Sequence, residues 1–90
     1  MSPYRVEITN QALRSLKKLP KPLVERLLNA ARSLQEDPRP AGFKKLTGFE
    51  NLYRIRVGDW RIIYSIEDNI LLVLVITIKP RGEVYKSIKN

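Results

Sequence analysis

The alternation of hydrophobic and polar residues predicts that the chain begins with a short strand and continues with two helices. Residues 4–8 alternate between apolar and charged side chains, which is the period-two pattern of a half-buried strand. Thr9 then offers a helix N-cap, and apolar residues at helical spacing predict a helix over residues 11–19. Prolines within residues 20–22 end this helix, and an apolar stripe predicts a second helix over residues 22–34. Because the break is short, we expect an antiparallel helical hairpin.

The middle of the chain predicts a tight β-hairpin with basic residues on one face. Residues 53–57 alternate between apolar and basic side chains, and Gly58-Asp59 supplies a two-residue turn because glycine tolerates the positive φ of such turns. With this turn Arg56 faces Arg61, and Arg54 lies on the same side of the hairpin. Like charges that face each other destabilise a sheet, so this grouping of arginines indicates an anionic ligand.

A third strand of the same meander is predicted over residues 70–78. Its side chains are apolar on both faces, which is typical of a strand that is covered on both sides or lies in the middle of a sheet. A turn at residues 68–69 would pair Arg61 with Ile76. The same count places Lys79 opposite the turn of the first hairpin.

These elements define an α+β fold of order β-α-α-β-β-β with a short C-terminal tail. The helical hairpin is expected to pack on one face of a mainly antiparallel sheet. Residues 37–42 contain two prolines and a glycine and predict an irregular connection, and residues 44–50 predict a loop or a short edge element. The chain of 90 residues predicts a single domain spanning residues 1–90.

The charge of the chain indicates that this fold belongs to a binding protein. Lysine and arginine number 17 against 9 acidic residues, which gives a formal net charge of +8 and an isoelectric point near 10.1. A strong positive field in a small domain indicates a polyanion or an acidic partner protein. The alternative is that the charge serves only solubility, and we favour the polyanion because the positive residues are unevenly placed.

Two residue types are missing from the sequence, and each absence narrows the chemistry. There is no cysteine, which excludes disulfides, thiol nucleophiles and cysteine-based metal sites. There is no histidine, so catalysis would run without the commonest acid/base residue, and zinc chemistry is disfavoured. The carboxylates form no convincing pair, which argues against a two-metal site. We therefore expect no metal and no other cofactor.

The chain carries no pattern that predicts contact with a membrane. Its first residues lack the basic region and apolar run of a signal peptide. The longest apolar run, residues 70–78, is too short to span a bilayer. We therefore expect a cytoplasmic protein with no membrane partner.

Further basic residues are expected to extend the arginine face of the hairpin. Lys79 and Arg81 follow the third meander strand, and with Tyr85 they would approach the hairpin from the C-terminal side. Lys44 and Lys45 precede the arginine strand and would rim the same surface. Each of these residues also has an ordinary interpretation, because exposed basic residues are often only a solvated face and a tyrosine in a tail can simply anchor it.

Clustered arginines suit the chemistry of a phosphodiester. The planar guanidinium donates two parallel hydrogen bonds to a phosphate and keeps its charge near neutral pH. Such groups can also stabilise the negative charge that builds up in the transition state of phosphodiester cleavage. RNA carries its own nucleophile, the 2′-hydroxyl group, so a protein could cleave it mainly by orientation and charge stabilisation.

Three stretches of this sequence resemble the RelE branch of the RelE/ParE toxin superfamily. They are residues 45–48 (Lys-Leu-Thr-Gly), residues 52–64 with the arginine hairpin, and residues 79–85 (Lys-Pro-Arg-Gly-Glu-Val-Tyr). The resemblance covers nearly the full length and includes the order of the elements. It implies the RelE-like microbial RNase fold. The absence of histidine fits the RelE branch and differs from relatives that place a histidine near the C-terminus.

The resemblance implies a toxin of a type II toxin–antitoxin system. RelE toxins enter the ribosomal A site on the 30S subunit and cut the mRNA there without a metal ion. The residues that match the family pattern as catalytic candidates are Arg54, Arg61, Arg81 and Tyr85, and the candidates for binding substrate are Arg56, Lys44, Lys45 and Lys79. A cognate RelB-like antitoxin, bound in a complex of higher order, is implied as the partner, and an acidic amphipathic segment that folds on binding would suit the positive field.

Two other functions stay open on the sequence alone. A ParE-like toxin inhibits DNA gyrase by protein contact and without catalysis, although such a protein would not need converging phosphate ligands. A ribosome-binding or RNA-binding module would bind without cleavage. Replacement of Arg61 or Arg81 separates this last hypothesis from the nuclease, because only a nuclease would lose cutting while keeping most of its ribosome affinity.

Overall fold

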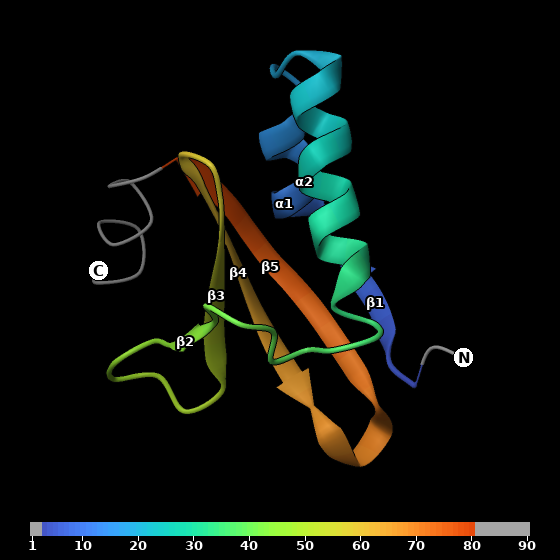
Figure 1. The fold of residues 1–90 in the computed structure, drawn as a ribbon, viewed down its shortest axis with the longest axis vertical. Helices are drawn as coiled ribbons and strands as arrows, with labels where there is room; N and C mark the ends of the chain where they lie inside the picture. The colour runs from blue at the N-terminus through green and yellow to red at the C-terminus, as the bar shows by residue number, and fades with distance from the viewer. Residues whose placement is uncertain (1–2, 81–90) are drawn as a thin grey trace.

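The computed structural model describes residues 3–80, which form one sheet and two helices (Figure 1). The elements in chain order are β1 (Arg5–Ile8), α1 (Asn10–Leu16), α2 (Lys21–Ser33), β2 (Lys44–Lys45), β3 (Leu52–Val57), β4 (Trp60–Glu67), a 3₁₀ turn (Asp68–Ile70) and β5 (Leu72–Pro80). The predicted α+β order is confirmed, and the short edge element expected after residue 43 is the strand β2. The predicted C-terminal tail lies outside the described residues.

The sheet has five strands in the order β1-β5-β4-β3-β2. β1 runs parallel to β5, and the other three pairs are antiparallel, so the expectation of a mainly antiparallel sheet is confirmed. β5 lies between β1 and β4, which explains why its sequence is apolar on both faces.

The predicted β3–β4 hairpin is present with the expected register. Val57 pairs with Trp60 and Arg56 with Arg61. Gly58 adopts a φ of +61°, the left-handed conformation that a two-residue turn requires and that glycine reaches without a steric penalty.

The predicted register between β4 and β5 is wrong. Glu67 pairs with Leu72 across a four-residue connection, in which Leu71 has a φ of +52°, and not across a two-residue turn. A bulge between Ile63 and Tyr64 shifts the pairing by a further residue. Arg61 therefore faces Lys79 and not Ile76, and Lys79 does not face the turn of the β3–β4 hairpin.

The start of α1 is as predicted, whereas its end is earlier. Thr9 is the N-cap, and its side-chain oxygen accepts a hydrogen bond from the Ala12 N–H at 3.2 Å while the hydroxyl donates to the Ile76 carbonyl at 2.7 Å. The helix ends at Leu16 and not at residue 19, and Pro20 contributes to this early end because a proline disfavours the helical conformation of the residue before it.

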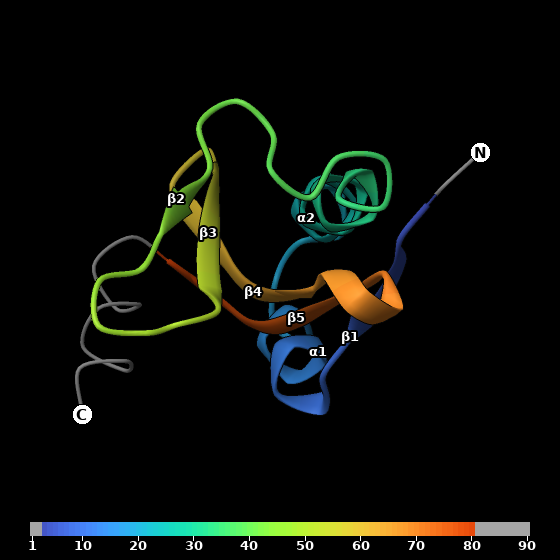
Figure 2. The same cartoon turned by 90° about the horizontal axis from the view of Figure 1, so that it is seen from below.

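Both helices bury their apolar residues against the same face of the sheet. Ala12 and Leu16 of α1, Leu27 and Ala31 of α2, and Leu34 directly after α2 belong to one buried cluster with core residues of β3, β4 and β5. Figure 2 shows α2 over the strands, with α1 beside β5. This packing covers one face of the β3–β4 hairpin and leaves its basic side chains on the other face.

The second face of the sheet carries a small apolar cluster of its own. Buried Leu46 and Ile63 pack there with half-buried Phe49 and Leu52. These residues anchor the segment that follows β2 against β3 and β4. Neither helix of the described residues 3–80 is long and apolar enough to cross a membrane.

Candidate nucleic-acid interface

Four strands bring basic side chains to the helix-free face of the sheet. Arg56, Arg61 and Lys79 are aligned in register across β3, β4 and β5. Arg54 lies two residues before Arg56, on the same face of β3, and pairs with Lys44 of β2. We call these five residues, Lys44, Arg54, Arg56, Arg61 and Lys79, the basic row. The predicted arginine face is therefore present, and the corrected register adds Lys79 to it directly.

The members of the basic row differ in their exposure. Arg56 and Lys44 are exposed and Lys79 is half-buried, whereas Arg54 and Arg61 are each only 4% exposed. Arginine is seldom buried to this extent, because removing its charge from water is costly. Arg56 and Lys44 can meet an anion directly, while contact between an anion and Arg61 requires the side chains around Arg61 to move.

Three predicted site residues do not join the described row. Lys45 pairs with Tyr53, so it lies on the opposite face of β2 from Lys44. Arg81 and Tyr85 lie outside the described residues 3–80.

A pocket of about 440 Å³ opens beside β3, next to the basic row. Its walls come from α2, the α2–β2 connection, β2 and β3, and its lining residues are Ala30, Pro40, Ala41, Gly42, Lys44, Arg54, Ile55, Arg56 and Val57. None of these residues is acidic, and three of them belong to the basic row. The pocket thus combines apolar residues with cationic side chains, which suits an anionic ligand.

Two polar contacts hold the connection that forms one wall of this pocket. The buried Tyr64 hydroxyl donates a hydrogen bond to the Pro38 carbonyl at 2.7 Å. The Arg39 guanidinium binds both carboxylate oxygens of Asp68, at 2.8 and 3.3 Å. Residues 40–42 follow directly, so these contacts fix where the wall stands relative to the sheet.

Asp68 also joins the segment before β1 to the same contact. The Tyr4 hydroxyl donates a hydrogen bond of 2.6 Å to one Asp68 oxygen. Hydrogen bonds from Arg39 and Tyr4 lower the pKa of Asp68, and the bond to Asp68 raises the pKa of Tyr4. Burial raises the pKa of Tyr64 above its usual value near 10.

Sequence reasoning missed the pocket wall and the residues that hold it. Ala30 was assigned to no site, and Pro40, Ala41 and Gly42 were only an irregular connection. The available signal was that these residues are small, which leaves room beside β3. No local pattern links Arg39 to Asp68, because 29 positions of sequence separate them.

Within residues 3–80, no three acidic side chains gather in a way that could hold a metal ion.

The face of the basic row also contains one buried hydroxyl group, that of Thr77. Thr77 lies opposite Ile63, and its oxygen has no hydrogen-bond partner in the described part of the chain. The arrangement as a whole offers cationic side chains beside a partly apolar pocket.

Comparison with known proteins assigns this fold to a class of small toxins. The sequence model for "ParE toxin of type II toxin-antitoxin system, parDE" matches residues 6–85. The chain therefore belongs to this family of toxins.

Within this class, several similar proteins and solved structures carry the name RelE. Toxin RelE of Mycobacterium tuberculosis is 32% identical over 85 residues, which cover 93% of this chain and 88% of that protein. The archaeal RelE-RelB complex from Pyrococcus horikoshii OT3 superposes with a TM-score of 0.78 at 36% identity, over 89% of this chain and 97% of the matched chain. The E. coli RelBE toxin-antitoxin complex gives a TM-score of 0.73 at 27% identity, over 88% and 98%. This chain is a type II toxin of the RelE type, as its resemblance predicted.

Proposed function

We propose that this toxin is a ribosome-dependent endoribonuclease that cuts mRNA in the A site and so inhibits translation. The observation that carries the proposal is the basic row, in which three cations stand side by side across β3, β4 and β5. A sheet tolerates such a row poorly unless an anion neutralises it. The names of its relatives, which are RelE toxins, support the same function.

The proposed reaction uses the RNA's own 2′-hydroxyl group. The 2′-oxygen loses its proton and bonds to phosphorus, the bond to the 5′-oxygen breaks, and that oxygen takes up a proton. Arg61 and Arg81 stabilise the charge on the scissile phosphate, and Arg54 supports them from β3. Tyr85 stacks on a base or assists the proton transfer. No metal takes part, and ribosomal positioning of the mRNA replaces a strong base.

The remaining basic residues bind the substrate strand. Arg56 and Lys44 are exposed and hold phosphates as the complex forms, and Lys79 extends this surface at the end of β5. Lys45, on the opposite face of β2, contributes only to the field that attracts RNA. Since Arg61 is buried, its contact with the phosphate belongs to a state in which the surrounding side chains have moved.

A RelB-like antitoxin is the proposed protein partner, in a complex of higher order. The RelE chains of similar structure from P. horikoshii and E. coli were solved in complex with RelB. The net charge of +8 favours an acidic partner segment that covers the basic row.

The test is primer extension on a defined mRNA in a purified translation system. We expect discrete cuts at A-site codons that require ribosomes, and a loss of about 100- to 1,000-fold in the cutting rate for Arg81→Ala. The exposed helix residue Arg32 provides the matched control, and Arg32→Ala should cut normally. Wild-type protein that stalls ribosomes while the mRNA stays intact would refute the nuclease in favour of a ribosome-binding module.

A ParE-like, noncatalytic inhibitor of DNA gyrase is the second candidate, because the family model that matches the chain is that of ParE toxins. A gyrase supercoiling assay with the purified protein tests it. Inhibition of supercoiling, together with intact mRNA in the translation system, would replace the proposed function with this one.

A further inference from the structure

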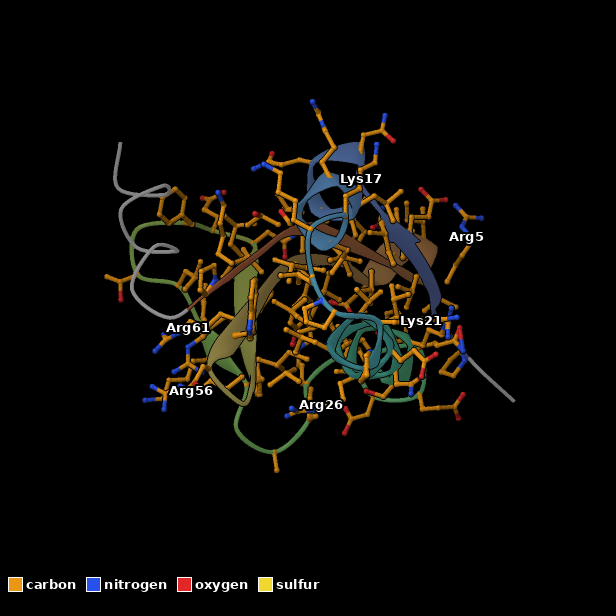
Figure 3. The ribbon with its side chains drawn as sticks, turned by 90° about the horizontal axis from the view of Figure 1, so that it is seen from above. Arg5, Lys17, Lys21, Arg26, Arg56 and Arg61 are labelled. Carbon is orange, nitrogen blue, oxygen red and sulfur yellow. The ribbon has the colours of Figure 1, made fainter. Side chains whose placement is uncertain are left out.

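Arg26 of α2 reaches over the β3–β4 turn. A Cβ atom built on Gly58 would lie 3.1 Å from Arg26 Nη2, which is closer than ordinary van der Waals contact. The guanidinium of a helix residue thus sits directly above the backbone of the turn. Figure 3 shows Arg26 between α2 and β3, with Arg56 and Arg61 on the outer side of the hairpin.

The Arg26 guanidinium has no acidic partner among residues 3–80, although Asp59 stands in the same turn. Two observations place this free cation at the end of the pocket beside β3. Ala30, one helical turn after Arg26 and on the same side of α2, lines the pocket. Val57, which precedes Gly58, also lines it.

The backbone of β3 is open at the same place. In a hairpin with a two-residue turn, the closing pair Val57–Trp60 exchanges hydrogen bonds, so the polar groups of Arg56 point away from β4. β2 pairs only with Tyr53 and Arg54, and therefore ends before it reaches Arg56. The Arg56 N–H faces the open edge, with the Arg56 side chain on one face of the sheet and Arg26 on the other.

We propose that this open edge of β3 binds a phosphate group of RNA, and that Arg26 is a phosphate-binding residue of this site. The site lies next to the basic row, since Arg54 and Arg56 belong to both. When an RNA strand binds on the row, a neighbouring phosphate of the same strand therefore lies at the pocket. The Arg26 and Arg56 guanidinium groups on the two faces, with the Arg56 N–H between them, offer several donors to the oxygens of one phosphate, so we take RNA as the occupant. An acidic protein segment is an outcome that the test distinguishes. The inference deepens the proposed function and rests on RNA being its ligand.

The test measures RNA binding apart from cleavage. A fluorescent single-stranded RNA with 2′-O-methyl groups cannot be cut through its 2′-oxygen, and its affinity follows from fluorescence anisotropy over a range of salt concentrations. We expect Arg26→Gln to weaken binding about 5- to 10-fold and to reduce the salt slope by about 0.7, the share of one phosphate contact in a single strand. Arg26→Lys should recover part of the affinity, because it restores the charge without the planar fork.

Arg32→Gln is the matched control, because Arg32 is also exposed on α2 and loses the same charge. It should change the affinity less than about 2-fold. The phosphate can come from mRNA or from ribosomal RNA, and cosedimentation with purified ribosomes distinguishes these sources. A defect of Arg26→Gln on the oligonucleotide supports the mRNA, and a defect on ribosomes alone supports ribosomal RNA.

The proposal fails if Arg26→Gln and Arg32→Gln behave alike in both assays, or if Arg26→Gln weakens only the complex with an acidic antitoxin. These outcomes are separate from a failure of the proposed function. If Arg26→Gln binds RNA and ribosomes as Arg32→Gln does, while the wild-type protein cuts mRNA, the phosphate site alone is refuted. A wild-type protein that never cuts mRNA, with the effect of Arg26→Gln on RNA binding intact, refutes the nuclease alone.

Discussion

Tyr64 connects the hydrophobic core to the wall of the pocket. Its ring is fully buried between the sheet and α2, and its hydroxyl reaches the Pro38 carbonyl. The sequence predicted that the ring faces the core, since Tyr64 shares a face with Tyr53 and Ile62. The partner of the hydroxyl was not predictable, because it lies in an irregular connection 26 positions earlier.

Removal of this hydroxyl should destabilise the protein. Tyr64→Phe leaves the buried Pro38 carbonyl without its donor, and we expect a loss of about 1–3 kcal/mol in the free energy of unfolding. Urea denaturation followed by circular dichroism measures it. Ser15→Ala, which removes an exposed hydroxyl in α1, is the control and should change stability by less than about 0.5 kcal/mol. Equal midpoints for Tyr64→Phe and wild type would show that the bond contributes nothing.

The raised pKa of Tyr64 also makes the stability of the protein depend on pH in the alkaline range. Burial raises the pKa in the folded state above the usual value near 10, so the folded protein holds the phenol proton more tightly than the unfolded chain. The stabilisation is complete below about pH 10 and is lost as the pH rises toward the folded-state pKa. Tyr64→Phe should therefore show a shallower fall in stability above about pH 10 than wild type does.

At the scale of elements, the α2–β2 connection shows how distant segments build the pocket. Arg39 lies in this connection, Asp68 in the β4–β5 turn and Tyr4 before β1, and all three meet in one set of hydrogen bonds. The sequence predicted each segment but not their meeting. Only the folded sheet, in which β1 and the β4–β5 turn are neighbours, brings them together.

Asp68→Asn should loosen this connection. The substitution removes the charge that binds Arg39, and we expect a lower melting temperature at neutral pH with faster amide hydrogen exchange at residues 41–43. Because the folded-state pKa of Asp68 is lowered, its stabilising effect is present above about pH 4 and is lost as the pH falls through that lowered value. The two proteins should therefore converge in stability under acid conditions. A constant difference from neutral to strongly acidic pH would contradict this account.

The β4–β5 pair shows the limit of counting along a sequence. The β3–β4 register was correct because a glycine-containing two-residue turn leaves no choice in the pairing. The β4–β5 register was wrong because apolar residues 70–72 gave no sign of where the turn ended, and because a bulge carries no pattern of its own. The prediction that Arg54, Arg56 and Arg61 share one face does not depend on this register, since all three belong to the β3–β4 hairpin.

At the scale of the whole molecule, the basic row and the net charge of +8 work against the folded state. We expect salt to raise the melting temperature, and phosphate to raise it more than chloride at equal ionic strength, because a multivalent anion binds between neighbouring guanidinium groups. Arg56→Gln should melt higher than wild type in low salt and lose most of the additional effect of phosphate. Arg32→Gln reports the general effect of phosphate on stability, and an identical response of the two variants would argue against an anion site on the row.

By itself, the sequence determined the order of elements, the two faces of the β3–β4 hairpin, the arginine grouping and the toxin family. These features depend on local periodicity, on one turn and on short motifs, all of which are encoded by neighbouring residues. The tertiary structure alone decided that Arg54 and Arg61 are buried while Arg56 is exposed, that Lys79 faces Arg61, and that Arg26 crosses to the hairpin turn. The physical reason is that burial, register and the pocket result from packing between segments far apart in the chain, which local patterns do not specify.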